Sequence, residues 1–247
     1  MKSIINLYWK CLRSSAVDLW NNLPILLGSI LAYFGFLLVA QILLPFGLVG
    51  RFLLGFVYIF ALTLYYGWLQ EIQAGKRVKF KNLGRFDYSL FSGIISVAFL
   101  LFLLEWIVQP FGQDPNTRWV YLCVELMLFL LLNAIPEIVY IGRVESLTAI
   151  QKSAHFVQSY WIEWFLPLVL LLTPILVLWS ENVLLALASA DPLLPPLLLV
   201  QQLSLYFQVT LPGVGYLGSL IGVIIATWFM IFRAYLFDGL ERRGTKL

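Results

Sequence analysis

Apolar residues of this chain form long blocks that are separated by short polar connectors. A block of about 20 apolar residues is long enough to cross the hydrocarbon core of a membrane as a helix. The spans predicted on this basis cover about 23–44, 52–69, 89–108, 119–141, 164–180 and 214–232. The pattern predicts an all-α fold, a polytopic bundle of six transmembrane helices in one integral membrane domain over residues 1–247.

The connectors before the first, third and fifth spans carry apolar and polar residues at helical spacing. In the first, Ile4, Tyr8 and Cys11 recur every three or four residues while charged side chains fall elsewhere, as in an amphipathic helix. We expect helices lying in the membrane interface over about 2–20, 78–88 and 144–160. For the first helix, the alternative is a soluble helix that packs on a cytosolic partner.

The same three spans open on similar sequences, which begin at Trp20, Tyr88 and Tyr160 with offsets of 68 and 72 residues. Each follows an amphipathic connector and precedes a return span. The chain is therefore predicted to consist of three units, each an amphipathic helix followed by a helical hairpin. Duplication would produce this repeat, and so would three independent hairpins of similar hydropathy.

The segment over about 192–211 is apolar and uncharged but is interrupted by prolines and glutamines. A seventh crossing here would move the basic residues near the C-terminus to the opposite side of the membrane, against the charge bias described next. We predict an outer element that either re-enters the membrane or lies in the interface.

Composition and charge agree with this threading. The chain is 61% hydrophobic and only 12% charged, with a mean hydropathy of +0.89, whereas soluble domains carry about 25% charged residues. Six crossings place 14 of the 16 Lys and Arg residues on the side of both termini, and only Arg51 and Arg118 on the other. Because cytoplasmic loops carry the Lys/Arg excess, both termini are predicted to be cytoplasmic.

The basic residues flank apolar runs and do not gather on a soluble face, which argues against nucleic acid as a partner. Those in the first two connectors are expected to contact anionic lipid headgroups, and they are Lys10, Arg13, Lys76, Arg77, Lys79, Lys81 and Arg85. The expected partners are membrane lipids, and other membrane proteins or a second copy of the chain.

Two carboxylates lie in neighbouring spans. Glu105 is near the outer end of the third span and Glu125 is nearly two turns inside the fourth, so the hairpin places them at similar depth. One hypothesis is a proton- or cation-linked site, because ionisable groups in a membrane are commonly functional. The alternative is structural: each carboxylate reaches outward, pairs with Arg118 or Arg51, or is hydrogen-bonded in the bundle.

A second polar group lies near the inner end of the fourth span, where Asn133, Pro136 and Glu137 follow closely. Pro136 should kink the helix and free a backbone carbonyl. Broken helices of this kind form substrate sites in transporters. The alternative is that Asn133 only hydrogen-bonds to a neighbouring helix and stabilises the bundle.

Signs of catalysis were not found. The sequence has no HExxH, P-loop, GxSxG or GxGxxG motif. The single histidine, His155, and the two distant cysteines, Cys11 and Cys123, form no ligand spacing. The sequence therefore predicts no catalytic residues, no metal site, no cofactor and no enzyme activity.

Two segments carry a family resemblance. RVESLTAIQKSAHFVQSYWIEW (Arg143–Trp164) places an acidic residue before an Ala–basic–Ser helix and an aromatic pair, at Glu145, Ala149, Lys152, Ser153, Tyr160 and Trp161. AGKRVKFKNLGRF (Ala74–Phe86) supplies a Gly–basic–Leu linker. The pattern resembles six-helix bacterial inner-membrane proteins of poorly defined function, including the membrane domain found beside glycerophosphodiester phosphodiesterases. The resemblance implies this fold and the bacterial cytoplasmic membrane, and no particular activity.

The leading functional hypothesis is a non-catalytic multi-pass inner-membrane protein that acts by packing. It would be an accessory or scaffold subunit of a membrane assembly, or a lipid-organising protein. The alternative is a small transporter or lipid-handling permease that uses the carboxylates within its spans.

Overall fold

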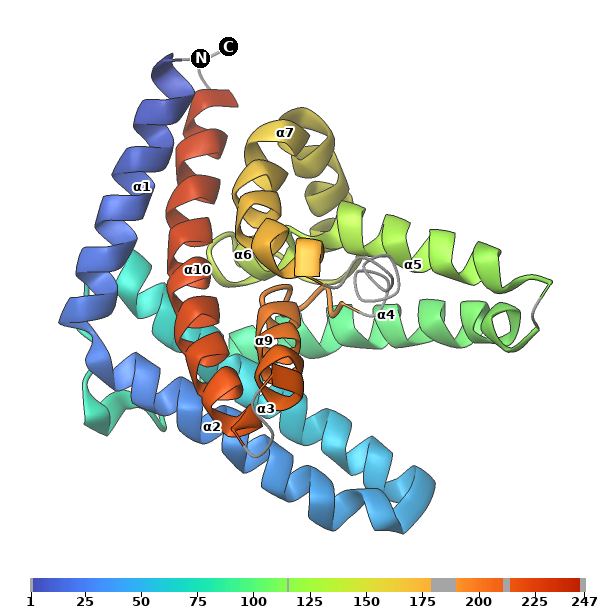
Figure 1. The fold of residues 1–247 in the computed structure, drawn as a ribbon. Helices are drawn as coiled ribbons and strands as arrows, with labels where there is room; N and C mark the ends of the chain where they lie inside the picture. Colours follow the sequence, from blue (N-terminus) through green and yellow to red (C-terminus); the bar gives the residue numbers. More distant parts are fainter. Residues whose placement is uncertain (1, 115, 179–189, 211–213, 245–247) are drawn as a thin grey trace.

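A computed structural model describes residues 2–114, 116–178, 190–210 and 214–244, and Figure 1 shows its fold. The described residues form helices and turns and no strand, which confirms the all-α prediction. Several helical segments are long and apolar enough to cross a membrane, as expected of a multi-pass membrane protein. Those among the described residues are Leu23–Gln73, Tyr88–Gln113, Arg118–Tyr140, Ser146–Thr173 and Gly215–Arg243.

The first of these segments is a hairpin of two helices, α2 (Leu23–Leu43) and α3 (Gly47–Gln73). Asn22 leaves helical geometry, with φ −124° and ψ 44°, and so separates α2 from the preceding helix. The 3₁₀ turn η1 (Leu44–Phe46) reverses the chain, and Gly47 follows it with φ 64°, which glycine adopts at little cost. The hairpin matches the first two predicted spans, with α3 about one turn longer at each end.

The prediction of an interfacial helix over about 78–88 is wrong. That segment is non-helical up to the start of the next helix, apart from the 3₁₀ turn η2 (Phe80–Asn82). A helix would bring basic side chains four residues apart together, and like charges at that spacing repel. The backbone N–H of buried Val78 instead donates to Asn22 Oδ1 at 2.8 Å, which docks the connector onto the first hairpin.

The second hairpin pairs α4 (Tyr88–Gln113) with α5 (Arg118–Leu132). The sequence predicted that its first helix ends near 108, yet α4 continues past Pro110. A proline so close to the helix end removes only one hydrogen bond. The last turn is stabilised by packing, because a Cβ on Gly112 would lie 3.1 Å from the Tyr121 ring of α5.

The return helix of this hairpin is broken. Helix α5 ends at Leu132 and the short helix α6 (Ile135–Tyr140) follows, with Pro136 in its first turn. The predicted kink is therefore confirmed, and it is a complete interruption of the predicted span over about 119–141. Asn133, which lies in this interruption, is buried.

The third unit begins with α7 (Ser146–Leu178), which is kinked at Tyr160, where φ is −131° and ψ is 25°. The kink separates an amphipathic half from an apolar half, as the sequence predicted for an interfacial helix followed by a span. Residues 179–180, the end of that predicted span, lie outside the described residues.

The predicted outer element contains α9 (Leu197–Thr210), which packs along α10 (Gly215–Gly244). Its 14 residues rise about 21 Å, which is shorter than the hydrocarbon core. The two helices touch closely at a GxxxG motif: a Cβ on Gly218 would lie 2.4 Å from the Leu203 carbonyl oxygen, and one on Gly222 2.7 Å from Val200 Cα. The close approach explains these two glycines.

Helix α1 (Lys2–Asn21) lies beside α10, with both termini at the same end of the molecule (Figure 1). Cys11 is buried in this contact, and Leu7 lies against Gly239. The opposite face of α1 is also apolar and is exposed, including Trp9 at 68% and Trp20 at 77%. The predicted amphipathic helix thus has two apolar faces, one packed on α10 and one exposed.

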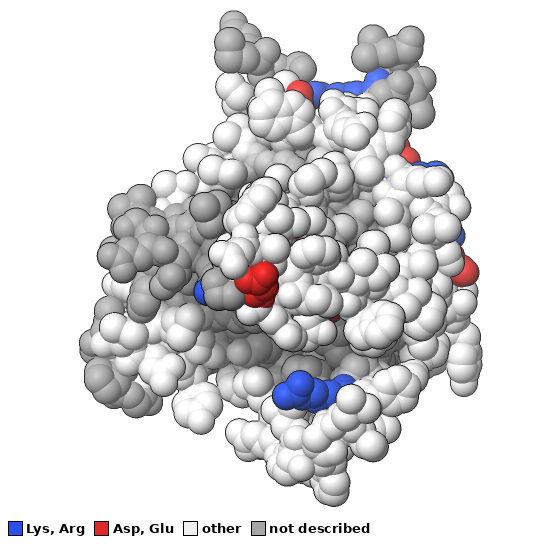
Figure 2. All heavy atoms as spheres, turned by 90° about the vertical axis from the view of Figure 1, so that its right-hand side faces the viewer, with Lys and Arg blue, Asp and Glu red and all other residues white. Residues whose placement is uncertain are grey.

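The hairpins α2–α3 and α4–α5 point away from the rest of the molecule (Figure 1). Figure 2 faces the side toward which both hairpins extend, and charged side chains form only isolated spots on it. The buried core lies at the opposite ends of the hairpins, where α3, α6, α7 and α10 meet. The fold therefore combines a packed centre with two apolar hairpins whose far ends extend beyond it (Figure 1).

Candidate functional site

A buried arginine lies near the middle of α10. Arg233 is 3% exposed, although the sequence predicted that the last span ends at about 232 and that this residue belongs to the cytoplasmic tail. Helix α10 continues without interruption to Gly244, so Arg233 lies inside a helix that extends beyond the predicted end of the span. A guanidinium in such a position requires compensation by an acid or by several hydrogen bonds.

Glu137 supplies the compensating charge. Arg233 Nε donates to Glu137 Oε1 and Arg233 Nη2 to Glu137 Oε2, both at 2.8 Å, and Glu137 is fully buried. The two parallel bonds form the bidentate geometry that planar guanidinium and carboxylate groups favour. Glu137 is in the first turn of α6, so the pair joins α10 to the second hairpin.

Asn133, in the break between α5 and α6, completes the arginine's environment. Arg233 Nη1 donates to Asn133 Oδ1 at 2.9 Å, and Nη2 donates to the Asn133 carbonyl oxygen, which the break leaves free. Trp164 of α7 donates its indole N–H to the same Oδ1 at 3.1 Å. Its ring lies 4.6 Å below the guanidinium carbon, a favourable cation–π contact.

These four side chains, Asn133, Glu137, Trp164 and Arg233, form the buried ion-pair cluster. The prediction from sequence correctly grouped Asn133 and Glu137 with Pro136, which lies in the first turn of α6, directly after the break. It missed Arg233 and Trp164, which are 96 and 27 residues from Glu137 in the sequence. Arg233 makes four hydrogen bonds within the cluster, so the cluster is built to hold α6, α7 and α10 together.

The second carboxylate group lies on the α4–α5 hairpin. As predicted, the hairpin brings Glu105 and Glu125 within reach of electrostatic repulsion. Glu105 is exposed, and Glu125 is partly buried with its Oε1 atom lacking a hydrogen-bond partner. Neither forms an ion pair within the described residues, so the predicted pairing with Arg118 or Arg51 is absent there.

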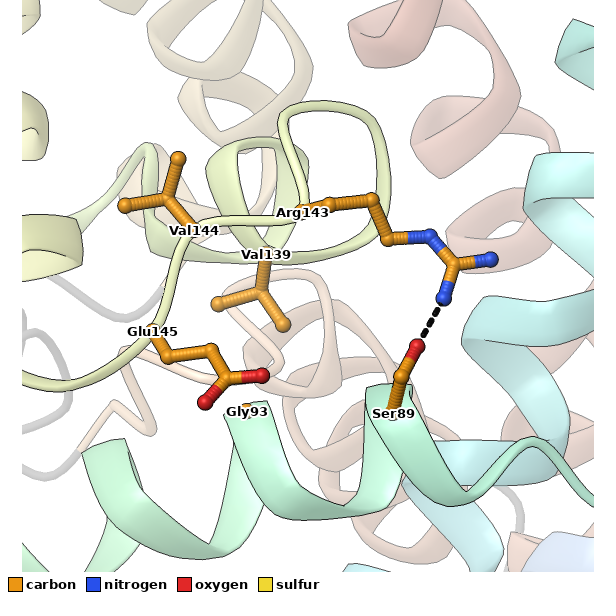
Figure 3. Close-up of a pocket in the computed structure, with 6 residues that line it drawn as sticks. All are labelled: Ser89, Gly93, Val139, Arg143, Val144 and Glu145. Carbon is orange, nitrogen blue, oxygen red and sulfur yellow. Dashed lines mark hydrogen bonds between the residues drawn. The ribbon is translucent and has the colours of Figure 1, made fainter.

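A third polar group surrounds Arg143, in the connector after α6. Its Nη2 donates to Gln70 Oε1 at 2.7 Å and to Asp87 Oδ2 at 2.9 Å, and its Nη1 donates to Ser89 Oγ (Figure 3). Asp87 also accepts from the backbone N–H of Ser89 and so caps α4. Burial acts to raise the pKa of Asp87, but the bonds from Arg143 and the start of α4 outweigh it and hold that pKa below 3.8.

Beside this group is a cavity of about 310 Å³, with the Glu145 side chain along one wall above Gly93 (Figure 3). Arg143 has φ 52°, a left-handed conformation that is uncommon for residues other than glycine. The tight turn after α6 returns the chain to α4, and the arginine then ties α3, α4 and the connector together. This polar group therefore serves as a surface contact that holds α3, α4 and the connector together.

The predicted headgroup-binding residues are all exposed. This holds for Lys10, Arg13, Lys76, Arg77, Lys79, Lys81 and Arg85. Exposure leaves their ammonium and guanidinium groups accessible to anionic headgroups, and binding of such lipids by these residues stays a prediction.

No protein-family model, curated protein or solved structure matches this chain. The resemblance to six-helix bacterial inner-membrane proteins therefore stays a prediction, and function has to be argued from the three polar groups alone.

Proposed function

We propose that the protein is a non-catalytic, six-span protein of the bacterial cytoplasmic membrane with both termini in the cytoplasm. It acts as an accessory or scaffold subunit of a membrane assembly, and its α4–α5 hairpin docks on a helix of the partner. The observation that carries this proposal is the position of Glu105 and Glu125, two carboxylates without an ion-pair partner among the described residues, on an apolar hairpin that extends from the core.

The surroundings of these carboxylates are those of a lipid-facing or partner-facing surface. On α4, Phe102, Trp106 and Ile107 flank Glu105 and are 59%, 66% and 61% exposed. Glu105 lies eight residues before the end of α4, about 12 Å along the helix axis. A carboxylate side chain is too short to reach the headgroups from that depth without distortion of the bilayer.

The partner's chemistry follows from this imbalance. A carboxylate facing lipid is costly, and a basic side chain or hydrogen-bond donors on a neighbouring helix would remove much of that cost. We therefore infer a partner helix that presents Lys, Arg or several Ser, Thr or Asn side chains to Glu105 and Glu125. The aromatic side chains around them would form the apolar part of the contact.

Site-specific crosslinking in native membranes tests the proposal. A photoreactive amino acid at Ile107, on the hairpin, should yield a discrete larger product, and the same group at Leu48, on the end of the α2–α3 hairpin, serves as the matched control. Both positions are exposed, at 61% and 84%. The Glu105→Gln/Glu125→Gln double variant should lose the Ile107 product while its expression stays unchanged.

The possible products separate the functions. A protein product at Ile107 that depends on both carboxylates supports a subunit role, and its mass shows whether the partner is a second copy. Crosslinks to lipid alone, together with purification as a monomer in mild detergent, would overturn the subunit role and favour a lipid-organising protein.

A second candidate function is a proton-linked transporter or permease, which the mutual proximity of Glu105 and Glu125 favours. The exposed position of Glu105 favours it less, because transport sites are enclosed between helices. Flux measured in vesicles decides: transport that is lost in either single Gln variant supports this function, and flux equal to wild type in both variants rejects it.

A further inference from the structure

An apolar pocket lies between α2, α3, α9 and α10, and none of its lining residues belongs to the three polar groups. Its volume is about 320 Å³, within the range of about 300–1,000 Å³ typical of ligand sites. Small side chains create it, because Ala32, Ala61 and Ala226 face it from α2, α3 and α10. We propose that this pocket binds one hydrocarbon chain of a membrane lipid.

Among the described residues, no Asp, Glu, His, Lys or Arg lines the pocket, and most of its hydroxyl groups are hydrogen-bonded. The hydroxyls of Ser29 and Thr227 donate to carbonyl oxygens of their own helices at 2.8 Å. Tyr65 is hydrogen-bonded to Thr227, and Tyr58 donates to Asp191. A buried water needs two to four polar partners, which this interior does not offer, so an apolar occupant is favoured over water.

The shape of the pocket fits an extended chain. Along α2 it runs from Ser29 to Leu37, eight residues or about 12 Å of helix. Leu37 and Gln201 are exposed and mark its opening toward the surroundings of the bundle. Because α2, α3 and α10 are long and apolar enough to cross a membrane, the molecules available at this opening are lipids.

Two polar groups at the rim have no partner among the described residues, the Tyr33 hydroxyl and the Gln201 amide. They can hydrogen-bond to a polar group carried by the occupant, while the interior takes the chain. A phospholipid acyl chain and the isoprenoid tail of a quinone share this chemistry, and mass spectrometry of the retained lipid distinguishes the two sources.

Photolabelling tests the site. The full-length protein is reconstituted into vesicles of phosphatidylethanolamine and phosphatidylglycerol with a small fraction of phosphatidylethanolamine that carries a diazirine in one acyl chain. We expect label on the pocket-facing residues of α9 and α10. Ala61→Phe, which fills the pocket, should lose that label and keep the label on the outer face of α4.

Gly55→Phe is the matched control, since it adds the same ring to the same helix at a position with open space around it. It should label as wild type does. If Ala61→Phe does not give a monodisperse protein, Ala32→Val fills less of the same pocket and should reduce the label. Equal labelling of wild type and the folded filling variants, or label confined to outer helix faces, would overturn the proposal.

This test is independent of the hairpin experiment, because the pocket and the Glu105–Glu125 surface share no residue. A second readout is thermal unfolding after delipidation. Added phospholipid should raise the midpoint of the wild type and of Gly55→Phe by ligand linkage, and should raise that of Ala61→Phe less. Equal shifts in all three proteins would count against the site.

Discussion

Glu125 and Glu137 lie twelve residues apart in the same predicted span, yet the burial and the hydrogen bonding of their carboxylates differ. Glu137 is fully buried and receives both bonds of a guanidinium. Glu125 lies on a hairpin, within electrostatic reach of Glu105, and its Oε1 atom has no hydrogen-bond partner among the described residues. Glu137 is therefore compensated within the fold, whereas Glu125 has no compensating group among the described residues.

The difference follows from where charge can be compensated. A buried ion pair is retained when its geometry is good and its remaining hydrogen-bonding groups are satisfied. Glu137 meets both conditions, because it accepts two bonds from Arg233 and the other guanidinium N–H groups donate to Asn133 in the break. Helix α5 is unbroken around Glu125, so no backbone group is free to help, and its side chain stays at the hairpin surface.

The largest effect is expected at the buried ion-pair cluster. Arg233→Met should lower the free energy of unfolding by about 3–5 kcal/mol, because it leaves the Glu137 charge buried without a partner. The measurement is the thermal midpoint in detergent, together with the elution profile in size-exclusion chromatography. Adding Glu137→Leu should restore much of the loss, since an apolar pair of similar volume avoids the buried charge. A midpoint equal to wild type in Arg233→Met would show that the cluster does not hold the helices together.

A much smaller effect is expected at the hairpin. The Glu105→Gln/Glu125→Gln double variant should change the free energy of unfolding of the isolated protein by only about 0.5 kcal/mol, and in the stabilising direction, because it removes repulsion between like charges. The same thermal assay measures it beside Arg233→Met. A loss as large as that of Arg233→Met would mean that the hairpin carboxylates are structural, and the contrast between the two regions would fail.

The smallest effect is expected at the exposed pair of Asp87 and Arg143, whose side chains are 36% and 40% accessible. Asp87→Asn should lower stability at neutral pH by less than about 1 kcal/mol. Because the folded-state pKa of Asp87 is below 3.8, its contribution is present above that pH and is lost as the pH falls further.

The difference between wild type and Asp87→Asn should therefore disappear on acidification below pH 3.8. Thermal midpoints recorded from neutral to acid pH check this. A difference that persists at the lowest pH would assign the effect to packing of the helix cap, with no part for its charge.

Several local features of the fold were predictable because they depend on nearby residues. The hairpin α2–α3 and the break before Pro136 each follow from a local signal, an apolar length in the first case and a proline in the second. The connector over 78–88 was mispredicted because its structure depends on Asn22, which is 56 residues from Val78. The continuation of α4 beyond Pro110 likewise depends on a ring of the next helix.

By itself the sequence determined the fold class, the approximate helix lengths and the candidate acids, because hydropathy and helix breakers act over a few residues. Only the tertiary structure decided which acid is paired. Arg233 pairs with Glu137 across 96 residues, whereas Glu105 and Glu125 form no ion pair among the described residues. Electrostatic compensation is a property of distance in space, and the packing of α10 against the break between α5 and α6 sets that distance.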